Sequence, residues 1–130
     1  MPLVRIDMFR NGSTRYRLAI RDAVCEAWGD VMDVSAEECH GVVIDHEADN
    51  QLNRHVGVQH NSDAISVTIA FDEEVGIDQK GLLYTAIVRA LRQRIGLADN
   101  EVTLKLVKIG DQGSVGDIWV WMRSQDESGR

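Results

Sequence analysis

Residues 64–109 read AISVTIAFDEEVGIDQKGLLYTAIVRALRQRIGLADNEVTLKLVKI, and three hydrophobic patterns follow one another along them. The run at 64–71 is rich in β-branched residues and predicts a strand. From Asp78 to Ile95 apolar residues recur every three to four positions, as on one side of an amphipathic helix, and Gly96 is a suitable C-cap. Residues 101–109 alternate apolar and polar side chains, which predicts a second strand. This segment is therefore predicted to be a β-α-β unit.

The beginning of the chain carries the same order of patterns. Residues 3–9, LVRIDMF, alternate as a strand does, and residues 40–47, HGVVIDHE, predict another strand. Ser13 is suited to cap the helix between them by accepting a backbone N–H bond. Apolar positions at helical spacing then continue from residue 14 to about Gly29, where we expect the helix to begin its end.

The two halves correspond position by position when the first is shifted by 63 residues. The shift brings together Val4 and Val67, Ile6 and Ile69, Ala23 and Ala86, and Trp28 and Leu91. We therefore predict two β-α-β repeats, at about 2–47 and 64–109, in one domain covering residues 1–130. A long loop at 48–62 would join them, and DIWVWM, 117–122, would add a short C-terminal strand or hairpin.

The repeats predict an α/β (α+β) fold, in which a four-stranded sheet carries two helices on one face. Crossover helices imply parallel strands within each repeat. The other sheet face then lacks a cover, and strand residues such as Val42, Ile44 and Val67 would be exposed on it. Association of several copies is the economical way to cover such a face.

Composition narrows the class of protein. The 130 residues are 44% hydrophobic and carry a net charge of −7, with a pI near 5.0. An acidic domain repels phosphate backbones, which argues against nucleic-acid binding. No secretory signal and no apolar run long enough to span a membrane stand out. Cys25 and Cys39 are too few for a disulfide scaffold, so we expect reduced cysteines and a cytoplasmic protein.

Pro2 is the residue with the most distinctive chemistry. If the initiator methionine is removed, Pro2 carries a free secondary amine at the chain terminus. Such an amine can take a proton from a carbon acid or enol and return it elsewhere, provided that an apolar pocket lowers its pKa toward neutrality. The alternative is structural: Pro2 starts a strand, where its missing N–H does no harm.

The amino-terminal proline and the two-fold repeat together resemble the tautomerase superfamily. The opening PLVRIDMFRNGS and the segments VSAEECHGVVIDHE, 34–47, and 78–111 look like its malonate semialdehyde decarboxylase branch. The resemblance covers nearly the whole chain. It implies a homotrimer of two-repeat subunits with the proline in a pocket near a subunit boundary, and chemistry without a cofactor.

The resemblance also implies roles for particular residues. Pro2 matches the catalytic proline of the family. Glu38 falls where the decarboxylase branch has an aspartate beside the proline, and a carboxylate there orients a water or tunes the protonation of the amine. A second interpretation of Glu38 stays open: Ser35-Ala-Glu-Glu38 has the spacing of a capping box.

The sequence departs from the branch after the third predicted strand. A close pair of arginines that holds the substrate carboxylate in the branch is replaced by Asp72, Glu73 and Glu74. Other cations are candidates to bind a substrate: the residues are His40, Arg54 and His55, and arginine suits a carboxylate through two parallel hydrogen bonds. Each of them also fits a solvated surface position.

Two tryptophans of the C-terminal strand are further candidates. Trp119 and Trp121 are two residues apart and therefore share one face of the strand. They are suited to wall an apolar pocket around the proline, or to pack in the core or in a trimer interface. No metal-ligand spacing such as CxxC or HExxH is present, so we expect no metal site.

These observations predict a cofactor-independent enzyme that uses Pro2 as acid and base on a small keto or enol acid. Weak, promiscuous tautomerisation is the leading expectation because the arginine pair is missing. A malonate semialdehyde decarboxylase-like lyase with another carboxylate-binding group is the first alternative. A catalytically silent trimeric binder is the second.

Overall fold

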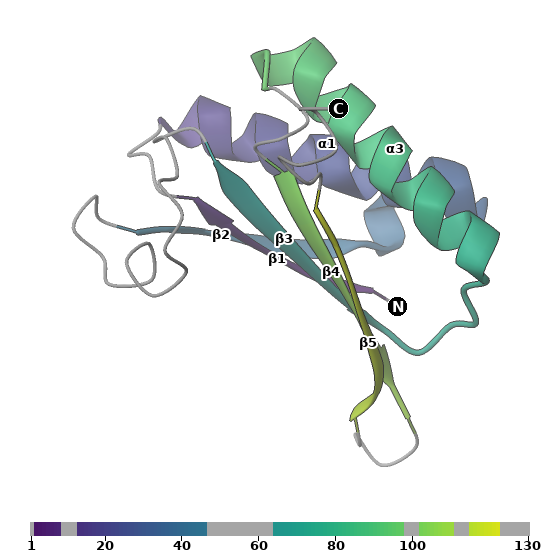
Figure 1. Cartoon of the computed structure of the whole chain (residues 1–130). Coiled ribbons are helices and arrows are strands. Elements are labelled where there is room, and N and C mark those ends of the chain that lie inside the picture. Colours follow the sequence, from purple (N-terminus) through teal and green to yellow (C-terminus); the bar gives the residue numbers. More distant parts are fainter. Residues whose placement is uncertain (1, 9–12, 47–63, 98–101, 111–114, 123–130) are drawn as a thin grey trace, which may run out of the picture.

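A computed structural model of the chain describes residues 2–8, 13–46, 64–97, 102–110 and 115–122 (Figure 1). Their strands form one five-stranded sheet in the order β2-β1-β3-β4-β5. The strands are β1 (Leu3–Met8), β2 (His40–Asp45), β3 (Ile65–Phe71), β4 (Val102–Ile109) and β5 (Val115–Met122). The helices α1 (Thr14–Met32) and α3 (Ile77–Ile95) lie side by side on one face of this sheet, and a 3-10 helix, η1 (Ala36–Glu38), precedes β2.

The two predicted repeats are present and meet at the centre of the sheet. β1 pairs in parallel with β2, and β3 pairs in parallel with β4, as the crossover helices require. β1 and β3 pair with each other in antiparallel orientation. The C-terminal strand is more than an appendage, because β5 pairs antiparallel with β4 and extends the predicted four-stranded sheet to five strands.

Helix α1 begins where the sequence predicts and ends later. The Ser13 hydroxyl accepts the N–H of Tyr16 at 3.1 Å, which confirms the N-cap. The helix continues past Gly29 to Met32, so the prediction that Gly29 begins its end was wrong. Gly29 is needed for a close approach instead: a Cβ there would lie 2.7 Å from the carbonyl oxygen of Val34. The chain therefore folds back against the last turn of α1.

The core lies between the helices and the near face of the sheet. Alternate strand residues point into it, and Val4, Ile6 and Val67 are fully buried there. The expectation that Val67 lies on the uncovered face was therefore wrong, because β3 begins its inward alternation at Ile65. Val42 is half-exposed on the uncovered face, as predicted, and Ile44 is partly buried.

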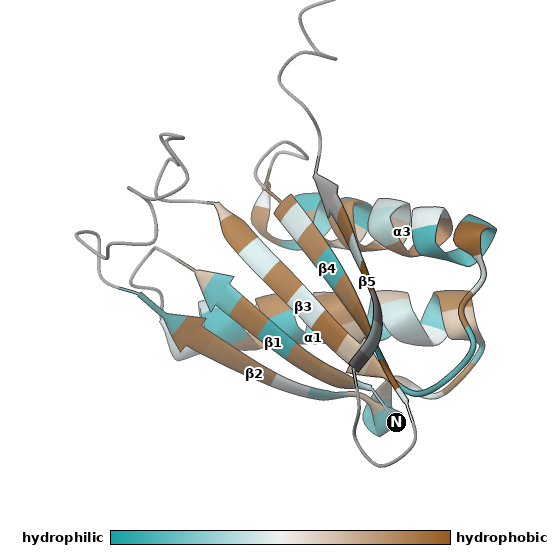
Figure 2. Ribbon diagram, turned by 60° about the horizontal axis from the view of Figure 1, so that its bottom comes forward, coloured by the Kyte–Doolittle hydropathy of each residue, from teal (hydrophilic) through white to brown (hydrophobic). Residues whose placement is uncertain are grey.

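The face away from the helices stays open in the single chain (Figure 2). Among the side chains that the structure describes, four exposed apolar ones lie on it: Leu3, Val42, Ile118 and Val120. Their placement follows from the strand register. Side chains alternate between the two faces along each strand, and these four residues have the opposite parity to the buried residues of the same strand or of the paired strand. Polar residues such as Arg5 and Lys105 lie between them, so the surface is mixed rather than continuously apolar.

Candidate functional site

Pro2 directly precedes β1, which lies between β2 and the central strand β3. It is buried, and its carbonyl oxygen accepts the backbone N–H of His40 at 3.2 Å. One residue further on, Leu3 is opposite both His40 of β2 and Ala70 of β3. Two neighbouring strands therefore fix the backbone next to Pro2.

The end of β3 carries a cation that the sequence analysis missed. Lys108 is opposite Phe71 in the β3–β4 register, and its ammonium lies 5.9 Å from the centre of the Phe71 ring. The same ammonium donates to the carbonyl oxygens of Asp72, at 2.5 Å, and Glu73, at 2.7 Å. It is also 3.5 Å from a carboxylate oxygen of Glu74. Lys108 thus holds the acidic segment Asp72–Glu74 in place through its backbone carbonyls and one carboxylate.

The alternation of side chains along β4 could have identified Lys108 as a residue that points toward the core. Val102, Leu104 and Leu106 point inward and are buried, so residue 108 has the parity of an inward-facing position. A lysine at such a position near the end of a strand must bring its ammonium back to polar groups or to solvent. Here the polar groups are the carbonyls at the end of β3.

Asp72 is electrostatically linked to the start of the chain. The positively charged amino terminus lowers the pKa of the Asp72 carboxyl group below its ordinary value of 3.8, through a hydrogen bond first and then through charge. A hydrogen bond with Glu73 acts in the same direction. Asp72 therefore stays ionised at neutral pH, and the charged amine that lowers its pKa belongs to the residue before Pro2.

Glu38 ends η1, two residues before the His40 amide that binds Pro2. Ser35 caps this short helix, but its hydroxyl accepts from the N–H of Glu37, at 3.2 Å, rather than from that of Glu38. The Glu38 N–H donates to the Ser35 carbonyl at 3.1 Å instead. Within the described ranges the Glu38 carboxylate has no hydrogen bond or ion pair, so the reciprocal half of a capping box is missing there.

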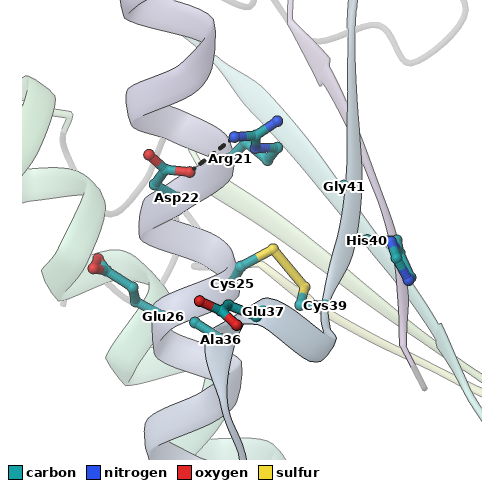
Figure 3. Close-up of a pocket in the computed structure, with 9 residues that line it drawn as sticks. All are labelled: Arg21, Asp22, Cys25, Glu26, Ala36, Glu37, Cys39, His40 and Gly41. Atoms are coloured by element: carbon teal, nitrogen blue, oxygen red, sulfur yellow. Dashed lines mark hydrogen bonds and ion pairs between the residues drawn. A yellow bond between two sulfur atoms is a disulfide. The ribbon is translucent and has the colours of Figure 1, made fainter.

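The proposed substrate-binding residues do not gather around Pro2 in one cluster. His40 contributes its backbone to the site, while its exposed side chain points away from Cys39 (Figure 3). Trp119 is partly buried against the core, opposite Leu106, so it packs on the helix-covered side. Trp121 is opposite Leu104 in the same register, but its side chain is outside the description. Arg54 and His55 also lie outside the described residues.

The two cysteines, which we expected to be reduced, are bonded to each other. Cys25 of α1 and Cys39, the C-cap of η1, form a disulfide with their Cα atoms 5.5 Å apart. The pattern of residues does not predict this pairing, because the two positions approach each other only when the chain folds back at Gly29. A pocket of about 410 Å³ opens over this bond (Figure 3). Its lining residues are Arg21, Asp22, Cys25, Glu26, Ala36, Glu37, Cys39, His40 and Gly41.

Two general features of the described ranges bear on the chemistry. Nowhere in these ranges do three His, Cys, Asp or Glu side chains come together in a way that suits a metal ion. Neither α1 nor α3 is both long and apolar enough to cross a membrane.

Comparison with known proteins finds likeness at the level of structure. No protein-family model and no curated protein sequence match the chain. A malonate semialdehyde decarboxylase, studied for its decarboxylase and hydratase activities, is 21% identical with a TM-score of 0.74, covering 96% of this chain and 94% of that one. A second malonate semialdehyde decarboxylase, inhibited by 3-bromopropiolate, is 22% identical with a TM-score of 0.72, covering 98% and 95%. A fused 4-OT that forms a symmetric trimer is 15% identical with a TM-score of 0.66, covering 87% and 94%.

Proposed function

Because the chain has the tautomerase-superfamily fold, close to the malonate semialdehyde decarboxylase branch, we propose that it is a cofactor-independent enzyme that uses Pro2. The substrate class is a small keto or enol acid, and the leading activity is weak, promiscuous keto–enol tautomerisation. The observation that carries the proposal is the position of Pro2: buried at the end of a central strand, with its carbonyl fixed by the His40 amide. The single proline of the chain stands at this position.

The chemistry requires that Met1 be removed, because only then is the nitrogen of Pro2 an amine. In its neutral form the amine takes a proton from the enol oxygen or from the carbon next to the carbonyl. The protonated amine then returns a proton to the other atom, so one group acts as base and acid in turn. Glu38 is proposed to orient a water or the amine, since no described residue engages its carboxylate.

The segment after β3 supports tautomerisation over decarboxylation. A decarboxylase must also orient the departing carboxylate, and Asp72, Glu73 and Glu74 repel such a group. Lys108 is a cation beside this segment, but two backbone carbonyls and Glu74 already engage its ammonium. We therefore infer that a carboxylate substrate is held weakly, and that Arg54, His55 or a residue of another subunit is needed to hold it tightly.

One observation favours the lyase alternative. A carboxylate beside an amine favours the protonated form of the amine, and Asp72 interacts with the amino terminus of the chain that still carries Met1. We infer that Asp72 acts in the same way on Pro2 once Met1 is removed. A protonated Pro2 is suited to polarise the carbonyl of a β-keto acid, which assists loss of carbon dioxide. A third possibility is a trimer that binds a small molecule without turning it over, which the missing arginine pair supports.

An assay of two substrates side by side tests the choice between tautomerase and lyase. We expect measurable tautomerisation of an arylpyruvate enol and poor or absent decarboxylation of malonate semialdehyde, because the acidic segment after β3 disfavours a carboxylate more than a carbonyl. The readouts are enol absorbance and aldehyde formation with the same preparation. Efficient decarboxylation with negligible tautomerisation would assign the lyase, and inactivity on both would favour the silent binder.

Glu38→Gln separates the two interpretations of Glu38. We expect activity to fall by about 10²-fold, as for loss of a group that assists proton transfer. We expect the free energy of unfolding to change by less than about 0.5 kcal/mol, because the carboxylate is exposed and the cap bond belongs to Glu37. Glu37→Gln is the matched control, since it removes the neighbouring exposed charge and should leave activity unchanged. Destabilisation of about 1 kcal/mol with normal activity would make Glu38 a cap.

We also propose that the protein is a homotrimer and that it works in the cytoplasm. The trimeric fused 4-OT with a similar fold supports the first statement, as does the open sheet face with Leu3, Val42, Ile118 and Val120. The low cysteine content of the sequence supports the second, and the Cys25–Cys39 disulfide counts against it. Small-molecule binding, rather than nucleic-acid or membrane binding, agrees with the net charge of −7.

Light scattering at micromolar concentration tests the trimer. We expect the mass of three chains for the unaltered protein, and dissociation for Val120→Lys, because it buries a charge in the proposed interface. Leu82→Lys is the matched control: Leu82 is exposed on α3, on the other side of the molecule, and its variant should stay trimeric. A monomeric mass for the unaltered protein, or equal behaviour of the two variants, argues against this interface.

A further inference from the structure

We propose that Cys25 and Cys39 form a redox-active pair, whose disulfide opens by exchange with low-molecular-weight thiols that enter the pocket above it. The two cysteines are 14 positions apart in the sequence and join α1 to the junction of η1 and β2. Both line the open pocket, so the bond is not sealed in the hydrophobic core. A disulfide that solvent-borne thiols can reach is the kind that exchanges readily.

The two sulfurs differ in their surroundings, and this difference sets the direction of attack. Cys39 is partly exposed, whereas Cys25 is only 6% exposed. An incoming thiolate therefore reaches the sulfur of Cys39, and Cys25 is the leaving group.

The pocket that holds the disulfide also contains a cation, Arg21. Arg21 precedes Cys25 by one helical turn, and both approach Gly41 of β2. A Cβ on Gly41 would lie 2.7 Å from the Arg21 Cγ and 3.7 Å from the Cys25 Sγ, so the arginine side chain and the sulfur are neighbours. Arg21 thereby adds a positive charge to the lining of the pocket, which favours a thiolate there, while its ion pair with Asp22 and the acids Glu26 and Glu37 oppose this effect.

The exchange balances with two molecules of a thiol such as glutathione. The first thiolate attacks Cys39, forms a mixed disulfide with it and releases the Cys25 thiolate, which takes a proton. The second thiolate attacks the sulfur of the bound thiol and releases the Cys39 thiolate, which also takes a proton. The protein gains two electrons, and the two small thiols become one small disulfide. The reverse sequence closes the bond again.

The disulfide and Pro2 are connected through the peptide unit between Cys39 and His40. Cys39 donates its N–H to Ala36 at 3.1 Å, and the next residue, His40, donates its N–H to the Pro2 carbonyl at 3.2 Å. The disulfide anchors this junction to α1. Opening it removes the anchor and loosens the hydrogen bond to Pro2. An effect on catalysis rests on the proposed function, whereas the thiol chemistry does not.

The first experiment equilibrates the full chain with mixtures of reduced and oxidised glutathione, traps free thiols by alkylation and counts them by mass spectrometry. We expect a reversible transition between the disulfide and the dithiol in the native protein. A bond that reduced glutathione leaves intact unless the protein is first denatured would overturn the proposal. So would two cysteines that stay reduced in oxidised glutathione.

Single variants test the direction of attack. With oxidised glutathione, Cys25→Ser exposes Cys39 and should form a mixed disulfide about tenfold faster than Cys39→Ser, which leaves only the buried Cys25. Equal rates, or the opposite order, would overturn the assignment of Cys39. The double variant Cys25→Ser/Cys39→Ser is the control for reagent effects and should not respond.

Hydrogen exchange of the unaltered protein tests the link to Pro2 without any activity assay. We expect the His40 amide to lose protection on reduction, while amides of α3 keep theirs. Unchanged protection at His40 would overturn the coupling. If the cysteines respond and no enzymatic activity is found, the proposed function fails alone.

Discussion

Replacing Pro2 by alanine is expected to lower any keto–enol activity by about 10²–10⁴-fold, the contribution typical of a group that transfers the proton. Alanine still presents an amine after removal of Met1, but a primary amine on a flexible residue differs from a ring nitrogen in basicity and orientation. The buried ring also contributes packing, so we expect a loss of stability of about 1–2 kcal/mol. This loss is small beside the change in rate, and circular dichroism should show an intact fold.

A matched control separates the amine from the ring. One alanine inserted between Met1 and Pro2 keeps the proline and its position at β1 but converts its nitrogen into an amide. We expect this variant to lose activity to the same extent as Pro2→Ala. Intact mass confirms removal of Met1 in each preparation. Full activity in either variant would show that Pro2 only starts the strand.

The repeat made most of the fold predictable. Each half carries a strand, a helix and a strand, and period alone distinguishes them because Val4 and Ile6 alternate while Leu83 and Ile87 recur at helical spacing. Capping chemistry then fixed one end of each helix to within a residue: Ser13 before α1 and Gly96 after α3. These signals are local, and local signals survive into the structure when packing agrees with them.

The incorrectly predicted end of α1 shows what local sequence patterns do not predict, namely contacts between separate segments. A glycine late in a helix predicts termination, but Gly29 sits under the returning chain and permits its close approach to Val34. The C-terminal strand itself was predicted, but its pairing with β4 was not, since that pairing depends on a partner that a single segment does not reveal. In both cases the deciding contact joins two different segments of the chain, so the hydrophobic pattern of one segment alone does not predict it.

The candidate site was predictable only in part, for the same reason. The position of Pro2 follows from the sequence because it directly precedes a strand. The engagement of Lys108 with Asp72 and Glu73, and the approach of Cys25 to Cys39, arise from pairs that are 14 to 36 positions apart. Spacing in sequence does not encode such pairs unless the register of the sheet is already known.

The largest effect on stability is expected from Trp28, which links the core to the site. Trp28 is fully buried in α1, and its ring centre is 5.7 Å from that of Phe71, the last residue of β3 before the acidic segment. Within the described part of the chain its indole N–H has no hydrogen-bond partner. We expect Trp28→Ala to lower the free energy of unfolding by about 3–5 kcal/mol, because it leaves a large cavity between α1 and β3.

Trp28→Phe separates the loss of the aromatic ring from the loss of the indole N–H. It keeps an aromatic contact with Phe71 and removes the unpaired N–H, whose burial costs about 1–3 kcal/mol. We therefore expect it to recover most of the stability that Trp28→Ala loses. Urea unfolding of all three proteins at one protein concentration measures the differences, since a trimer unfolds in a concentration-dependent way. A cost below about 1 kcal/mol for Trp28→Ala would mean that the core closes around the cavity. Phe71 would then not depend on Trp28 for its position beside Lys108.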